Sequence, residues 1–189
     1  VISRAAVAGV ILLALGISPA RAEGTVTNAT TTALLNALLG GGEGRLTFAD
    51  TLTFEIPVII ASDTVLRGEG SGGRLVTISG GSRHRLFRVL PGVRFEIHNC
   101  LLRDGIATNG GAILNEGVLL ASNVTFTACE ARGTAGVPGE PGRVEFGIGA
   151  DGGDGTDGGP ARGGAVDNLG EATFLQCTFN ANRSLGGEG

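Results

Sequence analysis

Most of the chain after residue 45 consists of short runs in which apolar and polar side chains alternate. Glycine, asparagine and aspartate separate these runs. Alternation with a period of two predicts strands with one buried face, and the separating residues predict tight turns. The clearest runs read LTFADTLTFEIPVII, DTVLRGEG, GRLVTISGG, RLFRVLPG and VRFEIHNCLLRDG. The pattern therefore predicts an all-β fold.

Residues 30–39, TTTALLNALL, are the one segment with a helical period. Their four leucines fall on one stripe, threonines can cap the start, and glycines at 40–42 provide a stop. We expect a short amphipathic helix here. It would belong to an N-terminal cap over residues 23–45, with the strands following over 46–189.

An internal repeat indicates how the strands are arranged. Residues 110–133 and 163–186 align without a gap at an offset of 53, with nine identities in 24 positions. Residues 94–103 give a third, weaker copy. A unit of about 22 to 24 residues is too short for helical crossovers but fits one coil of a single-stranded parallel β-helix, a β-solenoid.

The aligned copies predict which residues of successive coils stack on one another. Four columns are entirely apolar, as expected of a shared core: Phe95, Leu119 and Ala172; Ile97, Ala121 and Phe174; Cys100, Val124 and Cys177; Leu102, Phe126 and Phe179. Two other columns predict amide ladders at corners: Asn115 with Asn168, and Asn99 with Asn123 and Gln176.

The three cysteines are predicted to be free and buried. Cys100 and Cys177 share one column but lie two coils apart, about 10 Å, which is beyond disulfide reach. The odd number of cysteines leaves at least one free thiol or an intermolecular bond. No cysteine spacing matches a metal site.

Residues 133–163 interrupt the repeat and are rich in glycine, which recurs at every third position in two stretches. A collagen helix is not expected, because residues 144–148 break the period and the triplets are few. We predict a long extruded loop, either mobile or loosely polyproline-like.

Within this loop, GGDGTD at 152–157 matches the start of a calcium-binding nonapeptide, and Asp151, Asp154 and Asp157 are the candidate ligands. The match fails at Gly159, where a large apolar residue is required, and it occurs only once. We therefore expect no metal and no other cofactor.

The sequence predicts no catalytic residues. Outward-facing carboxylates and basic groups exist in the coils, but none forms a pair at a recognisable spacing. His84 and His98 also lack a catalytic partner and are read as surface residues. The candidates considered are Glu96, Asp104, Glu116, Asp167, Glu171, Arg67, Arg74, Arg88 and Arg103.

Composition and the N-terminus bear on partners and location. The net charge is −4 and all eight aromatic residues are phenylalanine, so the basic patch and stacking surface of a nucleic-acid binder are missing. Residues 1–22 combine Arg4, a short apolar run and Ala-Arg-Ala, which predicts a signal peptide. We expect an exported chain without a transmembrane helix in its mature segment.

The motifs GGAI (110–113) with FTAC (126–129), and GGAV (163–166) with FNAN (179–182), resemble the GGAI and FxxN repeats of polymorphic outer membrane proteins. More broadly, the chain resembles right-handed parallel β-helix proteins of the pectate-lyase-like superfamily. Cys129 departs from the FxxN pattern, and the superfamily's lyase motifs have no match. The resemblance implies a secreted or outer-membrane location and contact with cell-surface glycans or proteins.

Two functions follow as hypotheses. The first is a non-catalytic, exported or cell-surface adhesin or stalk segment that displays the glycine-rich loop. The second is the N-terminal part of a secreted polysaccharide lyase or glycoside hydrolase. Because the sequence stops directly after a coil, with an unprotected sheet edge, we expect a fragment truncated at its C-terminus.

Overall fold

The computed structural model describes residues 22–145, 148–149 and 151–189. Strands make up 44% and helices 6%, so the fold is all-β, as predicted. The predicted signal peptide lies outside the described residues apart from Ala22. Among the residues that are described, no helix is long and apolar enough to cross a membrane.

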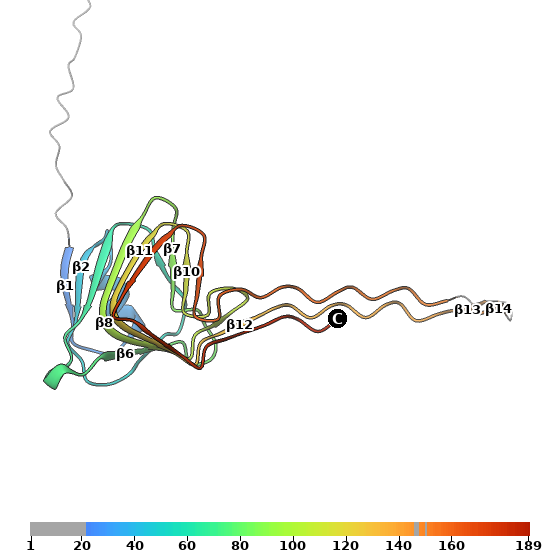
Figure 1. The fold of residues 1–189 in the computed structure, drawn as a ribbon, viewed down its shortest axis with the longest axis horizontal. Helices are drawn as coiled ribbons and strands as arrows, with labels where there is room; N and C mark the ends of the chain where they lie inside the picture. The colour runs from blue at the N-terminus through green and yellow to red at the C-terminus, as the bar shows by residue number, and fades with distance from the viewer. Residues whose placement is uncertain (1–21, 146–147, 150) are drawn as a thin grey trace, which may run out of the picture.

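The largest sheet is built from parallel neighbours (Figure 1). Its main path is β1 (Ala22–Val26), β2 (Gly42–Leu46), β5 (Thr64–Gly68), β8 (Arg94–Arg103), β11 (Val118–Thr127) and β16 (Glu171–Leu175). Along the second halves of β8 and β11 it also includes β3 (Leu52–Thr53), β6 (Val76–Ser79) and β17 (Thr178–Asn180).

Two smaller parallel sheets accompany it. One contains β4 (Val58–Ile60), β7 (Phe87–Val89), β10 (Ile113–Asn115) and β15 (Val166–Asn168); the other contains β9 (Ile106–Ala107), β12 (Glu130–Arg132) and β18 (Arg183–Leu185). Apart from these, β13 (Val144–Glu145) and β14 (Ile148–Gly149) form an antiparallel pair, and Ser71–Gly73 is a 3-10 turn.

The chain passes repeatedly between the large sheet and the sheet of β4, β7, β10 and β15, and from β8 onward each passage also includes a strand of the third sheet. We call each passage a circuit, and each strand pairs with its equivalents in the circuits before and after. Arg94 pairs with Val118, and Val118 pairs with Glu171, which is the alignment predicted from the repeat. The repeat in the sequence is therefore a repeat in space.

The corners of the circuits use left-handed backbone. Asn99, Asn123 and Gln176 form one column with φ between 53° and 55°, and Nδ2 of Asn123 donates to Oδ1 of Asn99 at 3.0 Å. Asparagine tolerates this region better than most residues. A second column at equivalent positions was not anticipated from sequence, because alanine gives no hint of it: Asp104, Ala128 and Ala181, with φ of 51° to 52°.

A buried amide marks another corner. Asn115 is fully buried, and its Nδ2 donates to Oδ1 of Asn168 at 2.6 Å and to the carbonyl of Glu171 at 2.8 Å. Its Oδ1 accepts from the backbone of Gly117. The predicted ladder thus ties successive circuits together and satisfies backbone groups that the turn leaves unpaired.

The predicted apolar columns form the core. Phe95, Ile97, Leu119 and Ala121 are at most 1% exposed, and the rings of Phe126 and Phe179 stack at 4.7 Å. Exposure rises in the last circuit, where Phe174, Leu175, Phe179 and Leu185 are 37% to 51% exposed. Among the described residues, no further strand lies beyond this circuit to cover them.

The cysteines also become more exposed in the last circuit. All three are free; Cys100 and Cys129 are buried, whereas Cys177 in the last circuit is only half-buried, so the prediction of burial is wrong for that residue. Burial raises the pKa of Cys100 to about 12 and that of Cys129 to about 11. Both buried thiols therefore stay protonated and unreactive near neutral pH.

The predicted helix is present but shorter. α1 spans Thr31–Ala37, and Thr30 Oγ1 accepts from the backbone of Ala33. Leu34 is fully buried, but Leu39 lies beyond the helix and is 78% exposed, so the predicted stripe does not extend to it. The helix packs closely on β1: a Cβ on Gly24 would come within 2.7 Å of the Ala37 Cβ.

Replacement of Phe87 tests the shared core. This side chain is fully buried, and its ring lies 5.4 Å from that of Phe54 and 5.1 Å from that of Phe95. We expect Phe87→Ala to lower the free energy of unfolding in urea by about 3–5 kcal/mol. Ile59→Ala, at a position 57% exposed, should change it by less than about 0.5 kcal/mol. If the two substitutions lowered the free energy of unfolding equally, the assignment of Phe87 to the core and Ile59 to the surface would be wrong.

Candidate functional site

The most prominent feature outside the sheets is a long projection, which we call the arm (residues 133–162). Figure 1 shows its two halves running side by side away from the sheets, with the C-terminal residues alongside. We name the parts the outgoing strand (133–143), the returning strand (151–162) and the terminal strand (185–189). The arm projects away from the sheets.

The hydrogen bonds of the arm recur at every third residue. The backbone N–H groups of Gly133 and Gly136 donate to the terminal strand at 2.8 and 2.7 Å. Those of Gly153, Thr156 and Gly159 donate to the outgoing strand at 2.7 to 2.9 Å. A β-ladder repeats every two residues, whereas polyproline II has three residues per turn. Of the two predicted conformations, the polyproline-like one describes this backbone.

The three strands bond to one another in a closed sequence. The outgoing strand donates to the terminal strand, the terminal strand donates through Gly187 to the carbonyl of Gly159, and the returning strand donates to the outgoing strand. The strands therefore surround a common axis, in the manner of the three chains of collagen but with one of them reversed.

Glycine is required where the strands meet. A Cβ on Gly136 would lie 1.9 Å from the carbonyl oxygen of Thr156, and one on Gly139 would lie 1.8 Å from that of Gly153. Such distances are well inside contact, so only glycine permits this approach. The break at residues 144–148 is where the chain reverses through β13 and β14. The glycine runs therefore pair within one chain.

The arm is an insertion that leaves the circuits in register. The offset between equivalent strands is 24 residues from Arg94 to Val118 and 53 from Val118 to Glu171, and the excess of 29 is the length of residues 133–161. At the base, Arg162 forms a bridge with Asn109, its equivalent in the preceding circuit. The sheets thus continue past the arm without adjustment.

The candidate calcium ligands lie on the returning strand and are exposed. Asp151, Asp154 and Asp157 are three residues apart, which in polyproline II places them about 9 Å apart along the strand. One calcium ion holds its oxygens at roughly 2.3–2.6 Å, so successive aspartates are too distant to share it. Among the described residues, no group of three or more His, Cys, Asp or Glu could hold a metal.

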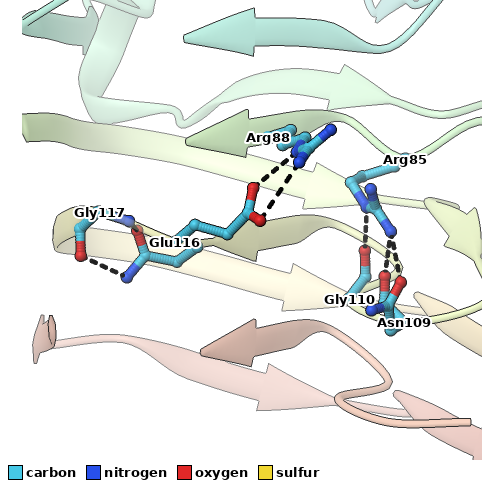
Figure 2. Close-up of polar contacts among 7 residues, drawn as sticks. Arg85, Arg88, Asn109, Gly110, Glu116 and Gly117 are labelled. Carbon is cyan, nitrogen blue, oxygen red and sulfur yellow. Dashed lines mark hydrogen bonds and ion pairs between the residues drawn. The ribbon is translucent and has the colours of Figure 1, made fainter. Parts of the chain in front are cut away.

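The candidate catalytic carboxylates of the strands are mostly engaged by arginine. Arg88 donates to both oxygens of Glu116 at 2.7 and 3.2 Å, which lowers the pKa of that carboxyl (Figure 2). Beside this pair, Arg85 donates to Asn109 and to the carbonyl of Gly110. Partial burial lowers the pKa of Arg85. These contacts join neighbouring circuits.

The large sheet carries similar pairs on its outer face. Arg67 lies 3.2 Å from Glu43, and Arg94 lies 2.7 Å from Glu96. The hydrogen bond from Arg94 is the main reason that the pKa of Glu96 is lowered. His98 Nε2 is 3.5 Å from the same carboxylate. A carboxylate held by a cation in this way is a poor proton acceptor.

The remaining candidates are scattered. Asp104 accepts from Ser79 at 3.1 Å and lies 3.4 Å from Arg103, while Arg74 and Glu171 are exposed. His84 is half-buried, and no hydrogen bond to its side chain was found among the described residues. Asp167 is 8% exposed, and its Oδ2 has no partner in the described part of the chain. Among the candidates that the structure describes, no nucleophile and base come together.

Glu130 is a buried charge that the sequence analysis missed. Its side chain is 8% exposed and lies between Arg132 and Arg183, the latter at 2.5 Å. The hydrogen bonds from these arginines, that of Arg132 foremost, lower the pKa of Glu130. The signal was present, because Glu130 and Arg183 are opposite charges at aligned positions of the repeat.

The pairing of Glu130 predicts a pH dependence. Because its pKa in the folded protein is below the ordinary value of 4.5, its ionised form stabilises the fold above that pH, and this contribution is lost as the pH falls further. In urea titrations, Glu130→Gln should therefore be less stable than the parent at pH 7, with the gap closing below pH 4.5.

Glu171→Gln serves as the matched control, since this exposed carboxylate has no ion pair among the described residues. Its effect should be small at every pH. If the difference in stability between Glu130→Gln and the parent stayed constant across the same pH range, the ion pairs of Glu130 would not be the source of its contribution.

Glycine substitutions test the arrangement of the arm. We expect Gly139→Ala to separate the outgoing and returning strands, because its Cβ would overlap the carbonyl of Gly153. Protease cleavage within 133–162 should become about tenfold faster, since local opening controls cleavage. Gly153→Ala, whose Cβ would make an ordinary contact at 3.5 Å, is the control. Equal cleavage of both variants would contradict the close approach.

No protein-family model, curated protein or solved structure matches the chain. The parallel sheets are compatible with a β-helix, and the resemblance to outer-membrane repeats rests on the short motifs alone.

Proposed function

We propose that the chain is a non-catalytic parallel β-helix, exported to the cell surface, whose role is to display the arm. The repeated circuits, the in-register parallel pairing and the stacked corner amides support the β-helix assignment. Parallel connections are almost always right-handed, which favours right-handed coils.

The observation that carries the proposal is the way the arm is inserted. Residues 133–161 are added between β12 and β15 without shifting any strand pair on either side. On one side of the insertion β12 pairs with β9 and β18, and on the other β15 pairs with β10. A stack that accepts a long, ordered projection at one corner is suited to presenting it.

Export is supported by the sequence pattern of residues 1–22, and the partners are proposed to be glycans or proteins of neighbouring or host cells. We further propose that α1 caps the first circuit. It connects β1 to β2, buries Leu34 and packs its last turn on β1, where it would shield the end of the core.

The alternative, a part of a polysaccharide lyase or hydrolase, has no specific observation in its favour. Acid and base catalysis needs two carboxylates facing a common space with separated pKa values. Among the described residues, Glu96, Glu116 and Glu130 each accept from arginine, which lowers the pKa of all three in the same direction.

Deletion of residues 133–161 tests the display function. The deletion joins Arg132 to Arg162 and restores the 24-residue spacing of the preceding circuit. We expect circular dichroism to keep its strand signal and the free energy of unfolding to change by less than about 1 kcal/mol, because no core contact is removed. Cells producing the variant should lose attachment to host cells or to coated glycans.

Surface labelling of intact cells provides the control, since an epitope tag in the turn between residues 69 and 74 should be reached in both proteins. Three results would overturn the proposal: a tag that cannot be reached on intact cells, undiminished attachment without the arm, or cleavage of polysaccharide by the purified chain.

A further inference from the structure

The corner between β5 and β6 is longer than the equivalent corners of the circuits that follow. Arg67 pairs with His98 before the corner, an offset of 31 residues, and Val76 pairs with Cys100 after it, an offset of 24. The seven extra residues are 69–75, which we call the corner loop. In the next circuit Asn99 alone occupies this corner. Figure 1 shows the corner loop, with its 3-10 turn, on the side of the sheets away from the arm.

The corner loop and the asparagine column beside it border a cavity of about 350 Å³. Asn99 and Asn123 line it from the circuits that follow, and Glu69, Arg74 and Leu75 line it from the corner loop. Sites for small molecules in proteins have volumes of about 300–1,000 Å³. The cavity therefore has room for one small ligand.

Several hydrogen-bonding groups in this cavity are unused. Nδ2 of Asn123 donates to Oδ1 of Asn99, which leaves Nδ2 of Asn99 as a donor and Oδ1 of Asn123 as an acceptor without partners among the described residues. Oε1 of Glu69 accepts from Arg45 at 3.1 Å, and its other carboxylate oxygen has no partner in the described part of the chain. Arg74 is exposed, and neither a hydrogen bond nor an ion pair engages its guanidinium within the described ranges.

This mixture of donors and acceptors indicates the class of ligand. A carboxylate or phosphate only accepts hydrogen bonds, so it would be repelled by Glu69 and by Oδ1 of Asn123. An ammonium group only donates, so it would be repelled by Arg74 and by Nδ2 of Asn99. A hydroxyl group both donates and accepts, and a ring that carries several hydroxyls matches all four groups.

We propose that this cavity binds one neutral pyranose ring, such as the terminal sugar of a glycan. Nδ2 of Asn99 and the guanidinium of Arg74 donate to hydroxyl oxygens of the sugar. Oδ1 of Asn123 and the carboxylate of Glu69 accept from its hydroxyl groups, and Leu75 contacts the C–H groups of the ring. The site lies apart from the arm, so the inference does not depend on the proposed display function.

The test titrates the purified, untagged chain separately with the methyl glycosides of glucose, galactose and mannose. NMR follows the side-chain amide signals of Asn99 and Asn123. We expect at least one glycoside to shift both sets of signals until they saturate. Arg74→Ala should weaken that binding by about tenfold, because a hydrogen bond from a charged donor is lost. Arg83→Ala removes an exposed arginine outside the cavity and should weaken binding by less than about twofold.

Deletion of residues 69–75 provides a second variant. It joins Gly68 to Val76 and restores the 24-residue offset through the whole corner, where glycine can adopt the left-handed backbone that Asn99 has. Circular dichroism should keep its strand signal, because no strand is removed. The glycosides should no longer shift the amide signals, because the cavity loses the wall that the corner loop provides.

The proposal is wrong if none of the glycosides shifts the amide signals, if Arg74→Ala binds like the parent, or if the deletion variant still binds. It is also wrong if sodium acetate shifts these signals to saturation and the glycosides do not, since the cavity would then be an anion site. Attachment through the arm is measured on cells with a different variant, so failure of one proposal leaves the other standing.

Discussion

Parallel backbone pairing between successive circuits is the interaction on which the rest of the structure depends. Each strand bonds to its equivalents in the neighbouring circuits, so a residue is stacked on the residue that holds its place in the repeat. Core columns, corner amides and ion pairs are consequences of that one register. A shift by one residue would turn every core side chain outward.

This register explains why charges gather in pairs on the outer faces. Stacked positions lie about 4.8 Å apart, so like charges in one column would repel and opposite charges pair without rearrangement. Glu130 with Arg183 follows this rule, whereas Arg67 stacks on Arg45 and reaches Glu43 diagonally. The arginines beside Glu96, Glu116 and Glu130 lower the pKa of these carboxylates, which makes the outer faces suited to joining circuits and poorly suited to proton transfer.

The strands of the arm are also paired through backbone hydrogen bonds, but with a period of three residues instead of two. Its strands have three residues per turn, so one position in three faces the common axis, and the axis has no room for a Cβ. Gly136 and Gly139 occupy such positions. The arm can be long and narrow without an apolar core because its cohesion comes from backbone hydrogen bonds and close approach rather than from buried side chains.

Much of the fold could be predicted because the repeat is written into the sequence. The alignment of residues 110–133 with 163–186 gave the register, and alternation gave the buried faces, down to the pairing of Phe126 with Phe179. The exceptions are positions where the neighbour in space decides. Cys177, in the last described circuit, lacks the cover that buries Cys100, and Leu39 falls beyond the end of α1.

The candidate site was less predictable. The glycine period of residues 133–163 indicated an extended backbone, but it did not reveal that the two runs face each other or that residues 185–189 join them. Those contacts link segments up to 52 residues apart, from Gly133 to Leu185 and from Gly136 to Glu188. By itself, the sequence determined the local period, two in the strands and three in the arm, because side-chain size and backbone freedom are local properties. Only the tertiary structure decided which strands lie side by side, because hydrogen-bonding partners are chosen across space.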